Sequence, residues 1–562
     1  MKRILLVLSL VAAQLSFAQV VDYNIVKEVR VHNKGVVVSA HPLASEAGAQ
    51  IMRAGGNAYD AAVATQYALA VVYPQAGNIG GGGFLVGVKN NGEKFTIDFR
   101  ETAPRKSSRD MYLDKKGNAN TDLSQNGHLA VGIPGSIAGF HATLKHCNLP
   151  MSQLIQPAID LAEKGFAVTD REANLLNSQM EFFVKHNKNQ NSFITGKKWK
   201  SGDLLVQKDL AETLKRIQKD GMKGFYEGKT AELIVSEMKR GNGIITLEDL
   251  KNYKVAERKP LEFQYKGHDI VAMPMPSSGG VLLAQMLKMA SYADLEKYQQ
   301  NSIEAVQIMT EAERRAYADR AEYMGDPNFV EDKTKMLISD EYLKNRWKSY
   351  NPQKATPSSE VGNIIKVPAE STETTHISII DKDGNAASIT TTLNGLYGSK
   401  VLVSGAGFFL NNEMDDFSIK PGVPNMFGAV GGEANAIQPG KRMLSSMTPT
   451  IVLKDQKPYI VVGTPGGTTI PTSVFQSIVN IIDFKLSPNQ AINAPKFHHQ
   501  WLPDNIAFEK NFPETTIEGL KKMGYEAEKR EAIGRTEYIQ IDKNGKIIAV
   551  ADGRGDDSVA AQ

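Results

Sequence analysis

The sequence has a single cysteine, Cys147, among 562 residues, which excludes an intrachain disulfide and a site built from several thiolates. It also has little net charge, because 65 basic residues against 62 acidic ones leave only +3. The clustered positive charge typical of nucleic-acid binding is therefore missing. With 41% hydrophobic residues, the composition is that of a globular protein that can bury a large core.

The first 18 residues have the layout of a secretory signal. Basic residues at positions 2 and 3 precede the apolar stretch Ile4–Ala13, and small residues stand before Gln19. This stretch is too short to span a bilayer as a permanent helix, and no long hydrophobic segment follows it. We therefore expect a signal peptide over 1–18, no membrane span, and a mature chain in the periplasm or secreted.

Two helical regions stand out by their periodicity. Ser45–Ala64 predicts a helix broken at Gly55-Gly56, with Asn57 capping a second helix. Apolar residues at helical spacing predict another helix within Asn301–Pro327, capped by Ser302. Its Glu and Arg residues are expected to form a solvent-exposed face.

Two glycine-rich segments lack the spacing of phosphate-binding loops. Asn78–Phe84 has neither the dinucleotide pattern nor a P-loop lysine, and Gly224–Thr230 places its first glycine one position too close to the lysine. Tight packing or turns are the expected roles. The polar stretch Asn351–Pro368 predicts a surface loop, where a chain is easily cut.

A β-hairpin is predicted directly after this loop. Thr374–Ile380 alternates apolar and polar residues, Asp381–Asn385 is a turn sequence, and Ala386–Leu393 is a second β-rich run. A three-residue loop with a left-handed glycine would place Thr374 opposite Thr392. A two-residue loop would shift the register by one residue and separate them.

The segment ESTETTHISIIDKDGNAASITTTLN resembles the start of the small subunit of γ-glutamyltransferases (γ-glutamyl transpeptidases), which are N-terminal-nucleophile hydrolases. The resemblance extends over nearly all of the mature chain. Its motifs are DFRETAP (98–104), GIPGSIAGF (132–140), PMPSSGG (274–280), NNEMDDFSIKPGVPN (411–425), LSSMTPT (444–450), GTPGGT (463–468) and NAPKFHHQWLPD (493–504). It implies an α/β (α+β) fold, a four-layer αββα sandwich shared by two subunits.

The family matures by cutting its own chain, and the resemblance places this cut between Glu373 and Thr374. It implies a large subunit of 19–373 and a small subunit of 374–562, joined as a heterodimer in one intertwined domain. Composition alone would equally allow Thr372 or Thr375; the family register selects Thr374. Cleavage frees an α-amine, whose ordinary pKa of ~7.7–8.0 suits a general base for the threonine hydroxyl.

The family's other functional positions map onto the quoted motifs. Thr392 matches the residue that orients the nucleophile, and Gly466 with Gly467 match the oxyanion donors, since glycine lets backbone N–H groups approach a substrate. The substrate's α-carboxylate side is implied to be Arg100, Ser445 and Ser446, and its ammonium side Asn394, Glu413 and Asp416. Asp415 is expected to be structural.

The segment Pro421–Gly432 matches the family's lid loop, with Phe427 where a tyrosine is usual. The ring is kept but its hydroxyl is lost, which leaves the balance of hydrolysis against transfer open. His498-His499 has no partner at metalloprotease spacing, so we expect a structural pair and no catalytic metal or cofactor.

The function implied is γ-glutamyl transfer from glutathione and related compounds to water, amino acids or peptides. Three alternatives remain. The same scaffold could cleave another acyl group, such as a glutaryl side chain of a β-lactam or a γ-linked polyglutamate. An inactive periplasmic binding protein is a second, and a Ser-His-Asp hydrolase is disfavoured because no GxSxG motif is present.

Overall fold

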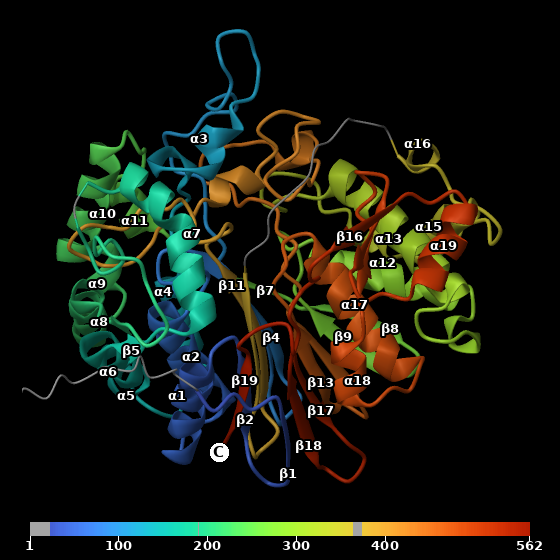
Figure 1. Ribbon diagram of the computed structural model, residues 1–562, viewed down its shortest axis with the longest axis horizontal. Coiled ribbons are helices and arrows are strands. Elements are labelled where there is room, and N and C mark those ends of the chain that lie inside the picture. Colours follow the sequence, from blue (N-terminus) through green and yellow to red (C-terminus); the bar gives the residue numbers. More distant parts are fainter. Residues whose placement is uncertain (1–22, 189, 363–373) are drawn as a thin grey trace, which may run out of the picture.

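The protein folds as two seven-stranded sheets that face each other, with helices covering both outer faces (Figure 1). The computed structural model describes residues 23–188, 190–362 and 374–562. One helical layer, containing α1 and α2, packs on the first sheet, and another, containing α12 and α17, packs on the second. The predicted four-layer αββα sandwich is confirmed.

The first sheet has the strand order β19-β2-β10-β11-β3-β4-β7, and every neighbouring pair is antiparallel. Its strands are β2 (Val36–Ser39), β3 (Gly82–Val88), β4 (Lys94–Asp98), β7 (Ala256–Arg258), β10 (Thr375–Ile380), β11 (Ala386–Thr392) and β19 (Ser558–Ala561). The predicted hairpin forms its centre, so it is buried on both faces.

The second sheet has the order β1-β18-β17-β13-β12-β9-β8 and is also antiparallel throughout. Its strands are β1 (Glu28–Val31), β8 (Leu261–Tyr265), β9 (His268–Ala272), β12 (Thr450–Lys454), β13 (Lys457–Gly463), β17 (Glu537–Ile541) and β18 (Ile547–Ala551). Each sheet contains strands from both sides of residue 374. Two subunits cut at that point would therefore share one fold.

Smaller elements complete the strand inventory: β5 (Phe166–Ala167) pairs with β6 (Leu204–Leu205), and β14 (Phe497–His498), β15 (Ile506–Glu509) and β16 (Ala527–Arg530) form a three-stranded sheet. The helices on the first sheet's side are α1 (Pro42–Arg53), α2 (Ala58–Val72), α3 (Thr121–Gln125), α4 (Ser136–Thr143), α5 (Met151–Leu154), α6 (Gln156–Lys164), α7 (Asp170–His186), α8 (Lys208–Asp220), α9 (Lys223–Tyr226), α10 (Gly228–Arg240) and α11 (Leu247–Asn252).

On the second sheet's side lie α12 (Gly279–Ser291), α13 (Ile303–Tyr323), α14 (Thr334–Leu337), α15 (Asp340–Trp347), α16 (Ser358–Val361), α17 (Thr469–Ile482), α18 (Pro488–Asn493) and α19 (Glu514–Lys522). The 3₁₀ turn η4 (Glu413–Asp416) carries two of the predicted site residues, Glu413 and Asp416. Within the described ranges, no helix combines the length and apolarity needed to cross a membrane.

The alternation in β10 divides the core into layers. Ile377 and Ile379 pack toward the α1 and α2 layer, in the same cluster as the apolar face of those helices. His376 and Ser378 face the opposite sheet, where the Ser378 hydroxyl donates to the carbonyl of Glu537 at 2.9 Å. The polar face predicted for the hairpin is thus an interior surface between the two sheets.

The predicted helix caps and the roles predicted for the two glycine-rich segments are confirmed. Asn57 caps α2 through a reciprocal capping box with Asp60, and Ser302 caps α13. The glycine run is tightly packed, because a Cβ on Gly81 would lie 2.1 Å from the carbonyl oxygen of Thr392. Gly228 has a positive φ of 59° and begins α10, which is the expected turn.

The predicted exposure of α13 is wrong. Its charged residues are buried, among them Glu311, Glu313, Arg314, Arg315 and Arg320. The helix lies between α12, α16 and α19, so its polar side meets protein as well. Glu311 pairs with the Nη1 atom of Arg315 at 2.5 Å and accepts from the hydroxyl of Tyr525 at 2.7 Å, which compensates its burial.

Candidate active site

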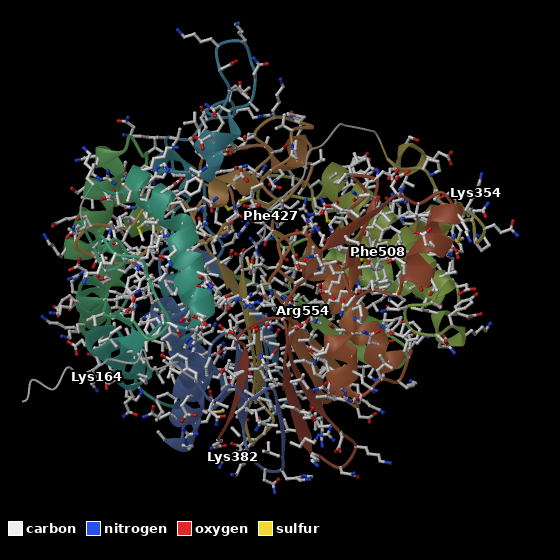
Figure 2. All side chains as sticks on the ribbon, in the orientation of Figure 1. Lys164, Lys354, Lys382, Phe427, Phe508 and Arg554 are labelled. Carbon is white, nitrogen blue, oxygen red and sulfur yellow. The ribbon has the colours of Figure 1, made fainter. Side chains whose placement is uncertain are left out.

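The hairpin β10–β11 positions the predicted nucleophile. Thr375 pairs with Thr391, and Gly384 in the turn has the left-handed φ of 89°, so the three-residue loop and its register are confirmed. The hydroxyls of Thr374 and Thr392 therefore face each other, with an Oγ1–Oγ1 distance of 3.4 Å. The tip of the hairpin, at Lys382, lies at the lower edge of the view, away from Phe427 (Figure 2).

A small pocket opens beside Thr374. The structure brings nine of the predicted site residues to its wall: Arg100, Thr374, Thr392, Asn394, Asp416, Phe427, Ser445, Ser446 and Gly467. Glu413 lies behind Arg100, and Gly466 precedes Gly467 in the same loop. Residues far apart in the sequence thus converge on one hydroxyl.

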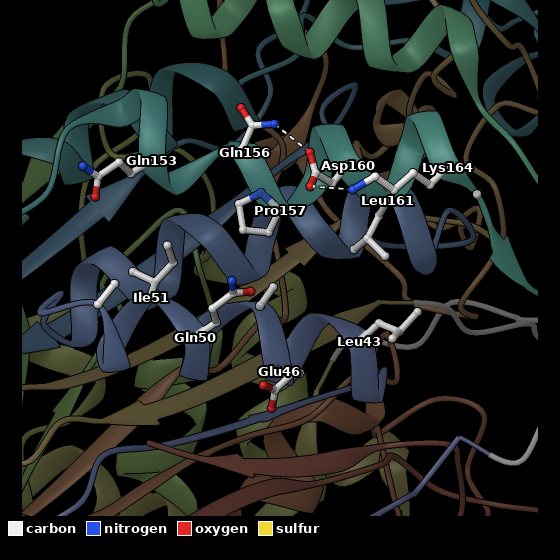
Figure 3. A pocket seen from close by; sticks show the side chains of 13 residues that line it. Leu43, Glu46, Gln50, Ile51, Gln153, Gln156, Pro157, Asp160, Leu161 and Lys164 are labelled. Carbon is white, nitrogen blue, oxygen red and sulfur yellow. Dashed lines mark hydrogen bonds and ion pairs between the residues drawn. The ribbon is translucent and has the colours of Figure 1, made fainter.

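A second, more open groove lies elsewhere, between α1 and α6 (Figure 3). Its wall includes Leu43, Gln50, Pro157 and Leu161, and none of the predicted site residues line it. It is larger than the pocket at Thr374, but it offers no nucleophile or oriented charge cluster, so size alone does not make it the reactive site.

Arg100 is the centre of a buried ion cluster. Its Nη1 atom lies 2.6 Å from Oε2 of Glu413, and its Nη2 atom contacts Asp416. Burial raises the pKa of Glu413 well above its usual range, although Arg100 opposes the shift. The motifs place Arg100 and these carboxylates on different sides of a substrate, whereas the structure joins them directly.

The glycine loop between β13 and α17 suits a developing negative charge. Gly466 and Gly467 have φ values of 138° and 55°, which side-chain-bearing residues rarely adopt. A Cβ on Gly467 would lie 2.6 Å from the Cδ1 atom of Phe427. Among the described residues, neither N–H donates a hydrogen bond to another protein group, so both remain able to bind an oxyanion.

The segment Pro421–Gly432, expected to be a lid, brings the ring of Phe427 to the pocket wall. This ring is 5% exposed and lies near the middle of the view in Figure 2. Two adjacent acidic residues hold this segment by hydrogen bonds. Asp416 accepts from Nδ2 of Asn425 at 2.9 Å, and Asp415 accepts from the backbone N–H of Met426 at 2.8 Å. Asp415 thus anchors the lid backbone, while Asp416 lines the pocket.

His376 is the histidine nearest the nucleophile in sequence, and its surroundings disfavour proton transfer. The ring is fully buried between the sheets, with Nδ1 2.8 Å from the Thr390 hydroxyl. Burial lowers its pKa to about 3, so it stays neutral. His498 and His499 are also buried, with ring partners in Thr472, Gln500 and Asp504. None of the three reaches the pocket wall.

The pocket wall includes three polar residues that the sequence analysis did not assign to the site: Arg320, Asn425 and Thr468. Asn425 closes the quoted motif NNEMDDFSIKPGVPN, so its position could have indicated a role. Arg320 lies on the face of α13 that was expected to be exposed, and only the buried environment of that helix reveals it. Glu373 and the loop end at 363–373 lie outside the described residues.

The chain is similar to known proteins over most of its length. The family model described as Gamma-glutamyltranspeptidase matches residues 44–562. The "Glutathione hydrolase proenzyme" of Escherichia coli (strain K12) is 46% identical over 531 residues, which cover 94% of this chain and 92% of the relative.

Two solved structures are also similar. The cephalosporin acylase from Bacillus halodurans superposes with a TM-score of 0.83 at 26% identity, covering 98% of this chain and 99% of its own. The Helicobacter pylori gamma-glutamyltranspeptidase gives 0.56 at 47% identity, covering 57% of this chain and 93% of its own. With a family model that spans most of its length, the chain belongs to the gamma-glutamyltranspeptidase family.

Proposed function

We propose that this protein is an exported γ-glutamyltransferase, which cleaves the γ-glutamyl amide of glutathione and related compounds. It passes the group to water, amino acids or peptides. One observation carries the proposal: the Thr374 hydroxyl, 3.4 Å from that of Thr392, opens into a pocket that also holds a buried Arg–carboxylate cluster and unoccupied glycine N–H groups.

Maturation precedes activity in this scheme. The Thr374 hydroxyl attacks the carbonyl carbon of Glu373, the peptide C–N bond breaks, and an ester forms while the α-amine of Thr374 is released. Water then hydrolyses the ester, which leaves a large subunit of 19–373 and a small subunit of 374–562. Removal of the signal segment 1–18 accompanies export to the periplasm or the medium. The signal cut and the Glu373 side of the internal cut lie outside the described residues.

Turnover then uses the new terminus. The α-amine of Thr374 takes the hydroxyl proton, and the oxygen attacks the γ-carbonyl carbon of the donor. Gly466 and Gly467 donate N–H groups to the oxyanion, the protonated amine gives its proton to the leaving amine, and the γ-glutamyl ester remains. The same amine activates water or an acceptor amine, which releases the group and restores the enzyme.

Recognition of the donor rests on its zwitterionic head. Asp416, Glu413 and the Asn394 side chain offer acceptors for the ammonium group, and Ser445 and Ser446 offer hydroxyls for the α-carboxylate. Arg100 holds the two carboxylates in place and contributes positive charge to the same wall. An acyl group without an ammonium would leave this acidic cluster unsatisfied.

A second candidate has one specific observation in its favour, the fold similarity to a cephalosporin acylase. That function predicts faster cleavage of a glutaryl anilide than of a γ-glutamyl anilide. The buried acidic pair at Arg100 favours the γ-glutamyl substrate, because a glutaryl group brings no positive charge to it. Rates on the two matched anilides decide between the candidates.

The proposal is tested by intact mass and N-terminal sequencing of purified, active protein, together with glutathione hydrolysis. We expect two polypeptides, one starting near Gln19 and the other at Thr374. An active preparation that contains one polypeptide beginning near Gln19 would overturn the nucleophile assignment. Two polypeptides without turnover of any γ-glutamyl donor would leave the cleavage standing and overturn the substrate class.

A further inference from the structure

The glycine run Asn78–Phe84 runs into β3 and lies against the end of β11, the strand that carries Thr392. In the ladder between these two strands, Gly82 pairs with Thr392. Asn78, the first residue of the run, is 4% exposed and does not line the pocket at Thr374. The proposed catalytic steps give it no role, yet its side chain connects several segments of this region by hydrogen bonds.

The amide nitrogen of Asn78 holds the end of β11. Its Nδ2 atom donates to the carbonyl oxygen of Thr392 at 2.9 Å, to that of Ala76 at 2.9 Å and to the hydroxyl of Thr391 at 3.2 Å. Two of these partners are carbonyl oxygens, which only accept, so the nitrogen and not the oxygen of the amide must face them. The contacts therefore fix the orientation of the side chain.

The amide oxygen of Asn78 is held on the opposite side. Its Oδ1 atom accepts from the backbone N–H of Gly81 at 2.9 Å and from the hydroxyl of Ser136 at 2.6 Å. Ser136 begins α4 in the motif GIPGSIAGF, and its backbone N–H donates to the carbonyl of Gly81 at 3.0 Å. Two segments to which the proposed mechanism gives no role thus converge on one buried amide, and both polar atoms of that amide have protein partners.

Thr392 is the residue on which this arrangement acts. The β10–β11 ladder ends at the pair Thr375–Thr391, one residue before Thr392, so the backbone of Thr392 is placed by its neighbours on the β3 side. Asn78 fixes its carbonyl there, while its hydroxyl lies 3.4 Å from that of Thr374. A shift of this carbonyl would turn the residue and move its hydroxyl. Misplacing a reacting group by about 1 Å can cost about 100-fold in rate, so the position of the carbonyl affects the chemistry.

We propose that Asn78 is a positioning residue for the nucleophile. It fixes the carbonyl of Thr392 and thereby keeps the Thr392 hydroxyl facing Thr374 during both self-cleavage and turnover. The inference rests on the proposed function and adds to it a residue outside the pocket wall. It separates two contributions to the site, because residues of the wall determine donor binding, whereas Asn78 affects the rate of the chemical steps.

The test is Asn78→Asp, which keeps the shape of the side chain and replaces its N–H donors with an oxygen. That oxygen would face the carbonyl groups of Thr392 and Ala76, so the end of β11 would be repelled instead of held. With a γ-glutamyl anilide we expect kcat to fall about 10- to 100-fold, while KM changes by less than about twofold because the pocket wall is intact. Self-cleavage, followed on a denaturing gel, should slow in parallel.

A double-mutant cycle tests whether Asn78 acts through Thr392. Thr392→Val removes the hydroxyl that Asn78 is proposed to position, so adding Asn78→Asp to it should lower kcat by less than about threefold further. A general distortion of the fold would instead multiply the two losses.

Asn480→Asp is the matched control. Asn480 in α17 is 6% exposed, and its Nδ2 atom donates to the carbonyl of Ala491 at 2.9 Å, outside the pocket wall. The same chemical change there should leave kcat and self-cleavage within about twofold of wild type. Should Asn78→Asp fail to fold, Ser136→Ala removes one partner of the amide oxygen and should lower kcat about two- to fivefold with KM unchanged.

Wild-type kcat and self-cleavage in the Asn78→Asp enzyme, an equal loss in Asn480→Asp, or losses that multiply in the cycle would each overturn the role given to Asn78. Where Ser136→Ala has to replace the first variant, a wild-type kcat does the same. A wild-type preparation that is uncut and turns over no γ-glutamyl anilide refutes the proposed function instead.

Discussion

The hairpin β10–β11 and the helix α13 both contribute to the pocket, and they bury polar groups in different ways. The hairpin buries neutral hydroxyls, such as Ser378 and Thr390, whose partners lie on the hairpin itself or on the facing sheet. The helix buries charges, and Glu311 depends on Arg315 within the helix and on Tyr525 more than 200 positions away.

Because of this difference, we expect substitutions in the two regions to have different effects. Losing a hydroxyl costs about 1 kcal/mol, which a large fold absorbs, so substitutions in the hairpin should show in the chemistry. Breaking a buried ion pair costs about 3–5 kcal/mol, because a charge is left without a partner. Substitutions in α13 away from the pocket should therefore show in stability. The predictions below test this division.

The largest effect is expected for Thr374→Ala. Removing the proposed nucleophile should leave a single uncut chain and lower γ-glutamyl anilide turnover at least about 10⁴-fold, because cleavage and catalysis use the same oxygen. Denaturing gel electrophoresis and initial rates measure the two effects. Thr374→Ser should restore cleavage, and Thr372→Ala should behave like wild type; a mature, active Thr374→Ala enzyme would refute the assignment.

The second-largest effect is expected for Glu311→Gln in α13. Burial raises the pKa of Glu311, but Arg315 and Arg314 outweigh it and hold the pKa below its usual range, so we expect the ionised pair in the native fold. We expect the free energy of unfolding to fall by about 3 kcal/mol. Urea unfolding should be measured in the Thr374→Ala background, so that one uncut chain unfolds.

The matched control for that change is Glu322→Gln, an exposed acid on the same helix. It should alter the free energy of unfolding by less than about 0.5 kcal/mol. Equal effects of the two substitutions would show that the buried pairs of α13 do not determine its stability, and the contrast with the hairpin would fail.

A smaller effect is expected for Thr392→Val, which keeps the shape of the side chain and removes its hydroxyl. Besides facing Thr374, this oxygen accepts from the backbone N–H of Asn394 at 2.8 Å. We expect turnover to fall about 10- to 100-fold with unfolding almost unchanged, because an orienting contact is lost. Thr390→Val, on the same strand but outside the pocket wall, is the control; a wild-type rate for Thr392→Val would exclude the orienting role.

The hairpin was predictable from the sequence because its determinants are local. Alternation fixes which residues share a face, and Gly384 fixes the turn, so the Thr374–Thr392 pairing follows from residues within a short stretch. The same holds for α2, whose start depends on the capping box at Asn57. The wider site was placed by the order of the motifs, which identifies the family.

The environment of α13 was not predictable in this way. The spacing of its apolar residues correctly indicates a helix. Charged residues on a helix face usually indicate that the face is exposed to solvent. In α13 this face is buried by contacts with α16 and α19, which the sequence does not show. The Arg100 cluster shows the same limit, since Glu413 lies more than 300 positions away. Which charge pairs with which depends on the three-dimensional arrangement of distant segments.

The smallest effect is expected for Phe427→Tyr, where lid and glycine loop meet. The ring of Phe427 packs on Gly467, and its carbonyl accepts from Nε2 of Gln500 at 3.3 Å. A hydroxyl there would add a polar contact to a closed lid and keep water out for longer, so we expect the ratio of transfer to hydrolysis to rise about two- to threefold. Product analysis with glycylglycine as acceptor measures it, and Phe427→Leu, which removes the ring, should lower the ratio. A ratio that does not change in either variant would mean that the lid does not control access of water. The partition of the ester between water and the acceptor would then depend only on the hairpin side of the pocket.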